Sequence, residues 1–242
     1  MVKVLVNGYK GKMGSTSVEA ILKDPNLELV GKTDELDNLE EEIYNSQAQV
    51  VVDFTHASVA YDNASKIIKS NACPVIGTSG FLQKEVSELQ KLCKEKELGG
   101  IIAPNFAIGA VLMMKFAKEA VAYMPNVEII EIHHDEKLDS PSGTAVRTAE
   151  LLCESSDNIS SVKMLKETLK GARGAELQGV NIHSIRLPGV IANQKVIFGG
   201  KGQTLTIEHN SLNRDSFMDG VCLACNKAVH LNKLYYGLEC IL

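Results

Sequence analysis

Residues 2–17 read VKVLVNGYKGKMGSTS, an apolar run followed by three glycines in GxxGxxG spacing. Residues 2–6 are rich in β-branched side chains, and helix-forming residues follow Gly14, so the glycines predict a turn between a strand and a helix. Glycine there permits a tight turn and a close approach of the backbone to a pyrophosphate, and the helix start offers free N–H groups. The stretch therefore predicts the first strand–helix unit of a dinucleotide-binding domain.

Beyond this turn, β-rich runs alternate with segments of helical spacing over the first hundred residues. The runs cover residues 2–6, 27–33, 49–53, 74–76 and 100–103, and the helical segments include 14–23 and 84–96. QVVVDF and GGIIAP are almost continuously apolar, as strands covered on both faces are. The alternation predicts an α/β fold whose N-terminal part is a Rossmann-like, doubly wound parallel sheet.

The pattern changes after residue 105. We expect a long apolar helix over 108–123, and strands near 128–133, 181–187, 194–198 and 203–209. Residues 155–179 are polar and are expected to be partly helical with a mobile loop. A helix near 215–231 and the tail 236–242 are apolar enough to return to the first domain. We predict a dinucleotide-binding domain of residues 1–105 and 214–242, and a central α+β domain with a mixed sheet of residues 106–213.

Composition argues against several functional classes. The 242 residues include 25 Lys and Arg against 30 Asp and Glu, for a net charge of -5, and 5% are aromatic. Such a chain offers no basic surface and few stacking rings, so nucleic acid is not an expected partner. No apolar run reaches the length of a membrane span, and MVKVLVNGYKGKMG enters a strand without a signal-like core. We expect a cytoplasmic protein with no membrane partner.

The cysteines and histidines do not indicate a metal site. Six cysteines are scattered over the chain, so reduced thiols are expected, and the CxxC of Cys222 and Cys225 is interpreted as helix packing. His133 and His134 are adjacent, and neighbouring residues of a strand point to opposite faces. No HxH or HxxxH spacing occurs nearby. We predict that the protein binds no metal.

Charged residues near the glycine turn bear on the choice of cofactor. Lys10 and Lys12 lie inside the turn, Lys32 lies near the end of the second predicted strand, and Asp34 follows twenty residues after Gly14. An acidic residue at that distance typically binds the adenosine ribose, whereas lysines can balance a 2′-phosphate. NADH and NADPH are therefore both expected to bind. The alternative is that the lysines are only solvated surface.

Two further turns follow predicted parallel strands, at DFT (53–55) and GTSG (77–80). Ligands of open α/β sheets bind at the carboxyl ends of the strands. These turns are therefore expected to border the nicotinamide half of the cofactor, although small hydroxylated turns also occur for structural reasons alone.

Residues 131–144, EIHHDEKLDSPSGT, combine several groups that handle anions and protons. His133 and His134 are potential proton donors, Lys137 is a cation, and Ser142 opens a predicted helix whose N-terminus can bind an anion. The combination suits an anionic substrate that must be protonated. Taken singly, each residue has a structural alternative: a histidine in a buried polar contact, a solvated lysine, or a serine N-cap.

The order of these motifs resembles one known family. GxxGxMG, DFT, GTSGF, APNFAIG (103–109), HHDEKLDSPSGTA (133–145) and a late Ser184–Ile185–Arg186 occur as in bacterial dihydrodipicolinate reductases, over nearly the whole chain. The resemblance implies NAD(P)H-dependent reduction of 4-hydroxy-2,3,4,5-tetrahydrodipicolinate, via dihydrodipicolinate, to 2,3,4,5-tetrahydrodipicolinate in diaminopimelate and lysine biosynthesis. It also implies that residues 106–213 bind this small dicarboxylate and build a homotetramer.

The same resemblance implies roles for individual residues. His133 takes the place of the proton donor, with Lys137 as its catalytic partner. The substrate carboxylates are expected on His134, Lys137, Ser142, Gly143 and Thr144, with Thr78 nearby. The cofactor is expected on Gly8, Tyr9, Lys10, Gly11, Lys12, Met13, Gly14, Asp34, Asp53, Phe54, Thr55, Gly77, Thr78, Ser79, Ala103, Asn105 and Phe106.

Departures from the family pattern and two rival hypotheses remain. Asp135 stands where many relatives have Arg, and Ala107 and Val111 stand where many have Ser and Asn, so polar contacts from these positions are in doubt. A different Rossmann-type dehydrogenase, of amino acids or amines, would share the glycine turn. A non-catalytic nucleotide sensor would share it too. Neither needs the histidine pair together with Lys137 and the Ser–Gly–Thr helix start.

Overall fold

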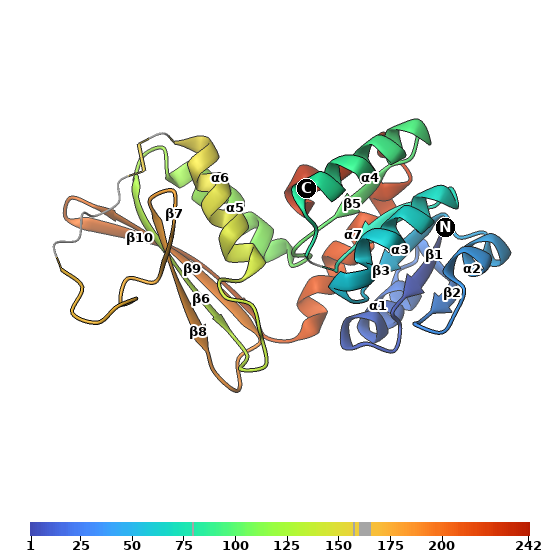
Figure 1. The fold of residues 1–242 in the computed structure, drawn as a ribbon, viewed down its shortest axis with the longest axis horizontal. Coiled ribbons are helices and arrows are strands. Elements are labelled where there is room, and N and C mark those ends of the chain that lie inside the picture. The colour runs from blue at the N-terminus through green and yellow to red at the C-terminus, as the bar shows by residue number, and fades with distance from the viewer. Residues whose placement is uncertain (79, 157, 160–165) are drawn as a thin grey trace. The chain divides into compact units, whose positions relative to one another are not determined.

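The computed structural model describes residues 1–78, 80–156, 158–159 and 166–242 (Figure 1). It divides into two compact units, residues 1–108 with 214–242 (unit 1) and residues 109–213 (unit 2). Within the described ranges, no helix has both the length and the apolar character needed to cross a bilayer.

Unit 1 is a six-stranded parallel sheet with the strand order β11-β5-β4-β3-β1-β2. Its strands are β1 (Val2–Asn7), β2 (Leu27–Thr33), β3 (Val50–Asp53), β4 (Cys73–Ile76), β5 (Gly100–Ile102) and β11 (Leu234–Tyr236). The β-branched residues of β3 and β4 are buried throughout, as in strands with helices on both faces. The fold is therefore the doubly wound sheet that the sequence predicts.

Helices cover both faces of this sheet. α2 (Leu39–Ser46), α3 (Ala57–Lys69) and α4 (Gln83–Glu95) pack in succession, whereas α1 (Lys12–Lys23) packs with α7 (Met218–Ala228). The short helices η1 (Arg214–Phe217) and η2 (Leu238–Cys240) flank α7 and β11. Between the sheet and α2–α4, residues such as Leu5, Val51 and Ile76 pack against Ile67 and Leu89 in the main core.

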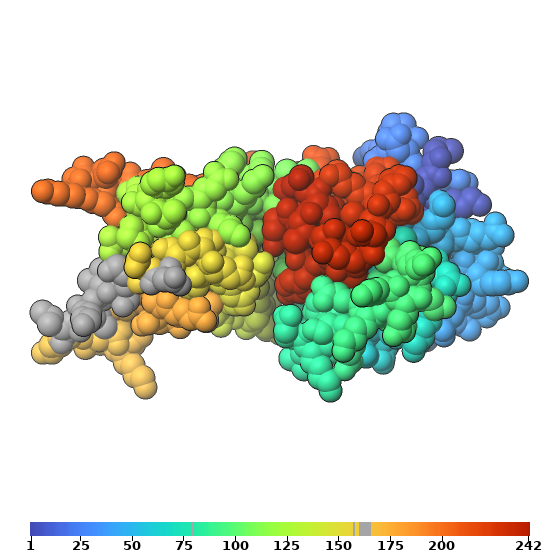
Figure 2. Space-filling view, turned by 90° about the horizontal axis from the view of Figure 1, so that it is seen from above, coloured from blue at the N-terminus to red at the C-terminus, as the bar shows by residue number. Residues whose placement is uncertain are grey.

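The C-terminal segment returns to unit 1 as a strand. β11 pairs in parallel with β5, from Leu234 opposite Gly100 to Tyr236 opposite Ile102. Figure 2 shows this red segment beside the green α4, which contacts β11. The sequence predicts the return of the tail but not its strand, because a run of three residues carries no readable period.

Unit 2 is a mixed sheet with the strand order β10-β9-β6-β8-β7. Its strands are β6 (Asn126–His133), β7 (Ala175–Leu177), β8 (Val180–Arg186), β9 (Ala192–Gly200) and β10 (Gln203–Ser211). β6 and β8 run parallel, and the remaining pairs are antiparallel. α5 (Ile108–Ala120) and α6 (Gly143–Ser155) lie along one side of the sheet (Figure 1). Val127, Ile129 and Glu131 are buried on that side.

One sequence expectation for unit 2 is corrected. Residues 155–179 are predicted to be partly helical with a loop, but 175–177 form β7, which pairs with β8. The strands are joined by Gln178 and Gly179, both with positive φ, at 49° and 91°. Two such residues make the tight turn that joins twisted antiparallel strands. Residues 157 and 160–165 of this stretch lie outside the described part of the chain.

Candidate active site

Two glycines at the turn between β1 and α1, Gly8 and Gly14, cannot be replaced by residues with side chains. Gly8 has φ +80°, and a Cβ there would lie 2.4 Å from the carbonyl oxygen of Phe54. A Cβ on Gly14 would lie 2.0 Å from the carbonyl oxygen of Gly8. Gly11 is the N-cap of α1 and has no side chain, so no N-cap side chain blocks the approach of a ligand to the start of that helix. The turn thus leaves a bare backbone cradle at a helix N-terminus, as a phosphate requires.

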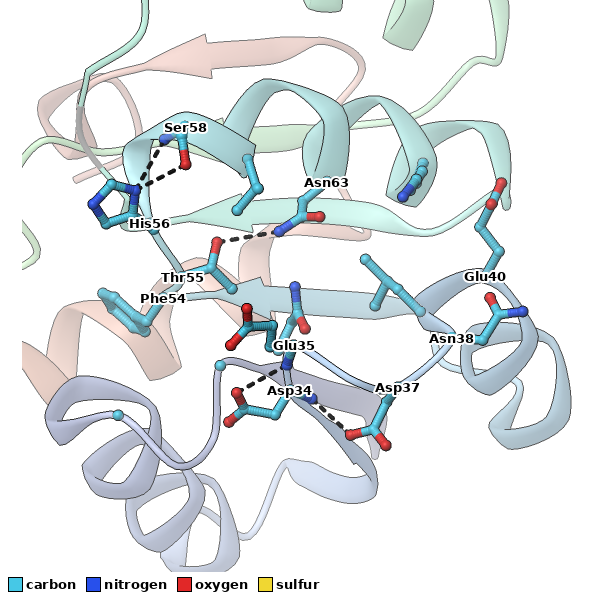
Figure 3. Close-up of a pocket in the computed structure, with 16 residues that line it drawn as sticks. Asp34, Glu35, Asp37, Asn38, Glu40, Phe54, Thr55, His56, Ser58 and Asn63 are labelled. Atoms are coloured by element: carbon cyan, nitrogen blue, oxygen red, sulfur yellow. Dashed lines mark hydrogen bonds between the residues drawn. The ribbon is translucent and has the colours of Figure 1, made fainter.

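A pocket of about 710 Å³ opens beside this turn (Figure 3). Residues at or just beyond the carboxyl ends of three neighbouring strands line it, drawn from 7–11 at the end of β1, 34–40 after β2 and 54–59 after β3. Of the predicted cofactor residues, it brings together Gly8, Gly11, Asp34, Phe54 and Thr55. The additional lining residues are Asn7, Glu35, Asp37, Asn38, Leu39, Glu40, His56, Ser58, Val59, Asn63 and Lys66.

One side of the pocket is acidic. Asp34, Glu35, Asp37 and Glu40 all line it (Figure 3). The Asp34 carboxylate accepts hydrogen bonds from the backbone N–H groups of Glu35 at 2.9 Å and Lys10 at 3.0 Å. These two bonds lower the pKa of Asp34 below its ordinary value. Asp34 is therefore held as a charged acceptor at the place where a ribose hydroxyl binds in this fold class.

The predicted lysines do not line the pocket. The ammonium groups of Lys10 and Lys32 lie 5.5 Å and 5.4 Å from the centre of the Tyr9 ring. Lys12 begins α1. Among the described residues that line the pocket, Lys66 is the one lysine or arginine. The pocket wall thus has a surplus of negative charge.

The side chain of Asp53 connects the carboxyl ends of the central strands through hydrogen bonds. Its side chain is fully buried, with Oδ2 accepting from the amides of Asn7 at 2.7 Å and Asn63 at 3.0 Å. Its Oδ1 accepts from the hydroxyls of Thr55 at 2.8 Å and Thr78 at 2.9 Å. The Thr78 hydroxyl also accepts from the backbone N–H of Thr55. Asp53 and Thr78, both predicted ligand contacts, therefore hold the turn that lines the pocket.

Two of the remaining predicted cofactor residues, Gly77 and Phe106, pack against the ring of Phe54. A Cβ on Gly77 would lie 2.0 Å from the Phe54 ring, and Phe54 meets Phe106 edge to face at 5.9 Å between ring centroids. Ala103 is buried, and Asn105 accepts from the backbone N–H of Ala107 at 2.8 Å. Ser79 lies outside the described residues. These residues fix the shape of the strand ends.

In unit 2, His133 ends β6 on the same face as Glu131. Its Nδ1 lies 2.5 Å from Oε2 of Glu131, and its side chain is 15% exposed. Glu131 is fully buried and also receives both terminal nitrogens of Arg186, each at 2.9 Å. The imidazole is therefore held through one nitrogen, which leaves Nε2 as the atom that can face a ligand.

The burial of Glu131 raises its pKa, but hydrogen bonds from His133, Arg186 and Ser184 outweigh burial. The pKa falls from 4.5 to about 2. Glu131 is therefore a carboxylate at neutral pH.

The loop after His133 carries a cation and an unsatisfied ring nitrogen. The Lys137 ammonium lies 2.7 Å from Oδ1 of Asp139, and its side chain is 22% exposed. Nδ1 of His134 is buried and has no hydrogen-bond partner among the described residues. Leaving a buried polar atom unpaired costs free energy, so it marks a place where a ligand group would be stabilising.

The start of α6 completes the site in unit 2. Ser142 is the N-cap, and its hydroxyl accepts from the backbone N–H of Ala145 at 3.2 Å. A Cβ on Gly143 would meet no atom within 4 Å, so open space adjoins the first residue of the helix. Thr144 follows in the first turn. His133, His134, Lys137 and this helix start thus belong to one short segment of unit 2.

Sequence reasoning misses the partners that orient these groups, mainly Glu131 and Arg186. The sequence does hint at Glu131. In the alternating pattern of β6, it follows the apolar Val127 and Ile129 on the same face. Arg186 is named in the Ser184–Ile185–Arg186 motif of the family resemblance, but its contact with Glu131 could not be read from the sequence, because it depends on β8 lying beside β6. Among the described residues, no group of three or more His, Cys, Asp or Glu side chains is arranged to hold a metal ion.

Known proteins resemble this chain in sequence and in structure. Residues 2–106 match the family model for the N-terminus of dihydrodipicolinate reductase, and residues 109–242 match that for its C-terminus. A 4-hydroxy-tetrahydrodipicolinate reductase of Lactococcus lactis subsp. cremoris is 51% identical over 98% of this chain and 96% of its own. One from Legionella pneumophila is 49% identical over 99% of both.

Solved structures agree at the level of the fold. The dipicolinate-bound dihydrodipicolinate reductase from Paenisporosarcina sp. TG-14 superposes with a TM-score of 0.87, at 43% identity and with complete coverage of both chains. A probable dehydrogenase from Thermotoga maritima reaches a TM-score of 0.67 at 11% identity, over 98% of this chain and 92% of its own. The second likeness shows only a shared fold.

Proposed function

This chain belongs to the dihydrodipicolinate reductase family, and we propose that His133 supplies the proton of its reaction while the pocket of unit 1 holds the nicotinamide cofactor. The enzyme is an oxidoreductase that reduces 4-hydroxy-tetrahydrodipicolinate in diaminopimelate and lysine biosynthesis, and it uses NADH or NADPH.

The residues of unit 1 fit a dinucleotide. Side chains at Gly8 or Gly14 would fill the backbone cradle before α1, and Asp34 offers a charged acceptor for a ribose. When bound, the reduced nicotinamide supplies the hydride. Asp53 and Thr78 hold the Phe54–Thr55 turn, which forms a wall of the pocket. The contribution of the protein here is position, because it holds the reactants in a productive geometry.

The residues of unit 2 fit a small dicarboxylate. We assign its carboxylates to His134, Lys137 and the Ser142–Gly143–Thr144 helix start. Support comes from the unpaired Nδ1 of His134, the Lys137 ammonium and the open space beside Gly143. The bound dipicolinate of the Paenisporosarcina relative supports the same class of ligand. Lys137 acts beside His133 by stabilising negative charge that develops on the ring.

His133 is the proton donor in this proposal. As hydride reaches one ring carbon of the conjugated imine, the neighbouring carbon gains electron density, and a proton from Nε2 of His133 forms the new C–H bond there. The observation that carries this assignment is the fixed contact of Nδ1 with Glu131, because it leaves the other nitrogen for the substrate. General acid catalysis of this kind contributes about a hundredfold to ten-thousandfold in rate.

The direct test uses substrate generated enzymatically from pyruvate and aspartate semialdehyde, with nicotinamide oxidation followed at 340 nm. His133→Gln is expected to lower kcat by at least about a hundredfold, with the dissociation constant of NADH nearly unchanged. His183→Gln is the matched control, since His183 also contacts a glutamate of β6, Glu128, at 2.8 Å. If His133→Gln keeps more than about half of the wild-type kcat, His133 is not the donor.

We also propose a homotetramer in the cytoplasm. The face of the unit 2 sheet opposite Val127 and Ile129 presents Ile130, Ile132 and Ile197, which are only partly buried in the isolated chain. Apolar side chains on an uncovered sheet face favour packing against another copy. The six cysteines are all free, as is usual in a reducing compartment.

A further inference from the structure

Glu131 is a charged residue at a position built for an apolar one. In β6, Val127, Ile129 and Glu131 alternate on the face that is buried, and Glu131 has no exposed surface. A buried carboxylate is costly unless it is fully paired, so its presence requires partners that offset the loss of water. The neighbours of Glu131 meet that requirement.

Both carboxylate oxygens of Glu131 are shared between functional groups. Oε2 receives Nδ1 of His133 at 2.5 Å and one terminal nitrogen of Arg186 at 2.9 Å. Oε1 receives the other terminal nitrogen of Arg186 at 2.9 Å and the backbone N–H of Ser142 at 3.2 Å. One side chain therefore joins β6, β8, the proposed donor and the start of α6.

Arg186 extends these contacts into the loop. The nitrogen that donates to Oε1 of Glu131 also donates to the backbone oxygen of Asp139 at 2.7 Å. Asp139 in turn holds the Lys137 ammonium through its carboxylate. The loop between His133 and Ser142 is thus tied to the buried pair at its middle through Asp139 and at its end through Ser142.

We propose that Glu131 and Arg186 form a positioning pair that sets the tautomer of His133 and holds Lys137 in place for the reaction. The inference rests on the proposed function and deepens it. Neither residue touches the substrate in this scheme. Glu131 acts through His133, and Arg186 acts through the loop.

The chemical reason lies in which nitrogen keeps its proton. Because the Glu131 carboxylate stays ionised at neutral pH, it accepts the Nδ1–H of His133 and holds that proton on Nδ1. When the substrate carbon takes the Nε2 proton, His133 becomes the neutral Nδ1–H form, and Glu131 remains a carboxylate. An amide at position 131 could instead donate to Nδ1 and favour the neutral tautomer whose only proton is on Nε2. Giving that proton to the substrate would leave an imidazolate rather than a neutral ring.

The competing explanation is that the pair only stabilises unit 2. Removing one partner of a buried ion pair is strongly destabilising in either case, so a loss of stability does not distinguish a structural role from a positioning role. The two explanations differ in catalysis. A structural pair affects kcat only through the folded fraction, whereas a positioning pair changes the turnover of the folded enzyme and the state of the His133 ring.

Glu131→Gln and Arg186→Lys are the test variants. For Glu131→Gln, we expect kcat to fall at least about tenfold per folded active site, with the KM for NADH unchanged. Its ¹⁵N ring shifts for neutral His133 should move from the Nδ1–H toward the Nε2–H pattern. For Arg186→Lys, which keeps the charge but loses the paired contact, we expect a KM for the heterocyclic substrate raised at least about threefold because Lys137 is displaced. Arg186→Lys also serves if Glu131→Gln fails to fold.

Glu128→Gln is the matched control, because Glu128 lies on the opposite face of β6 and also pairs with an arginine and a histidine, Arg173 and His183. It should keep the wild-type kcat and leave the His133 ring shifts unmoved. The tautomer role is overturned if folded Glu131→Gln keeps both the wild-type kcat and the wild-type ring shifts. The loop role is overturned if Arg186→Lys leaves both KM and kcat unchanged. If His133 is not the proton donor, His133→Gln keeps its activity. The ring shifts of His133 in Glu131→Gln still test whether Glu131 sets the tautomer.

Discussion

At the scale of single residues, the pocket of unit 1 differs from what the sequence suggests. The sequence places lysines 10, 12 and 32 near the cofactor as a counterweight to a 2′-phosphate. In the structure the pocket wall carries Asp34, Glu35, Asp37 and Glu40. Lys10 and Lys32 lie beside Tyr9 instead. A 2′-phosphate near the acidic wall would meet like charge, whereas a ribose diol can donate to Asp34.

We therefore expect the enzyme to use NADH with a kcat/KM at least about tenfold above that for NADPH. Glu35→Arg should raise the kcat/KM for NADPH at least about tenfold, because it replaces a repulsive charge with a partner for phosphate. Initial rates with both cofactors measure this. Glu28→Lys is the charge-matched control, since Glu28 is exposed near the opposite end of β2. Equal use of both cofactors by the wild-type enzyme would refute the expectation.

At the scale of elements, the start of α6 combines a helix N-terminus with open space. A Cβ at Gly143 would touch nothing, and its φ is not in the positive range that favours glycine. Alanine at this position should therefore leave the fold intact or stabilise it by ~0.5–1 kcal/mol, since glycine in a helix loses more conformational freedom. Among the described residues of unit 2, no contact requires glycine at this position.

Gly143→Ala is expected to raise the KM for the heterocyclic substrate at least about tenfold, because the new methyl group occupies space that we assign to a carboxylate. The melting temperature and the KM for NADH should stay close to wild type, which makes them internal controls. Steady-state kinetics and thermal unfolding together check this. A variant with wild-type KM would show that the substrate does not approach the first turn of α6.

The tie between β6, β8 and α6 predicts a dependence of stability on pH. The pKa of Glu131 in the folded protein is about 2, below its ordinary value of 4.5. A lowered folded pKa means that the stabilisation is complete above about pH 4.5 and is lost as the pH falls toward 2. The difference between the two values corresponds to about 3 kcal/mol for this buried group.

The free energy of unfolding of wild type should therefore exceed that of Glu131→Gln near pH 7, and the gap should shrink between pH 4.5 and pH 2. Glutamine does not titrate, and protonated Glu131 resembles it in charge. Urea unfolding at a series of pH values measures the gap. If the difference in unfolding free energy stays constant down to pH 2, Arg186 and His133 do not stabilise the carboxylate form of Glu131.

At the scale of the whole molecule, the open face of the mixed sheet predicts assembly. Ile130, Ile132 and Ile197 lie on that face, beside charged pairs such as Lys195 with Glu208. Four copies of the 26.3 kDa chain are expected in solution. Light scattering should report that mass. Ile197→Lys should shift the population to smaller species, because an ammonium would have to be buried in the interface.

Exposed Leu22→Lys, in α1 of unit 1, is the control, since it adds the same charge to the unit that does not contain this sheet. A wild-type protein that stays monomeric at micromolar concentration would contradict the tetramer without affecting the catalytic assignments.

Much of this protein can be predicted from sequence alone. The GxxGxxG turn, the apolar strands and their spacing predict the doubly wound sheet, because such patterns depend on neighbours within a few residues. β2 (Leu27–Thr33) has the predicted bounds. The segment 131–144 likewise predicts the groups around His133, since they lie close together in the chain. The short strands β7 and β11 are missed, because pairing with β8 and β5 decides them.

The tertiary structure alone decides which partners hold these groups. Arg186 reaches Glu131 across 55 positions of sequence because β8 pairs with β6, and Asp53 meets Asn7 across 46. Contacts between residues so far apart produce no periodic pattern in the sequence. A charged or polar residue type can therefore suggest a salt bridge or a turn, but it does not identify the partner residue. The sequence determines which chemical groups are available and on which elements they lie. The pairing of distant strands decides which of them are buried together, and burial is what makes a carboxylate such as Glu131 able to hold a histidine in one tautomer.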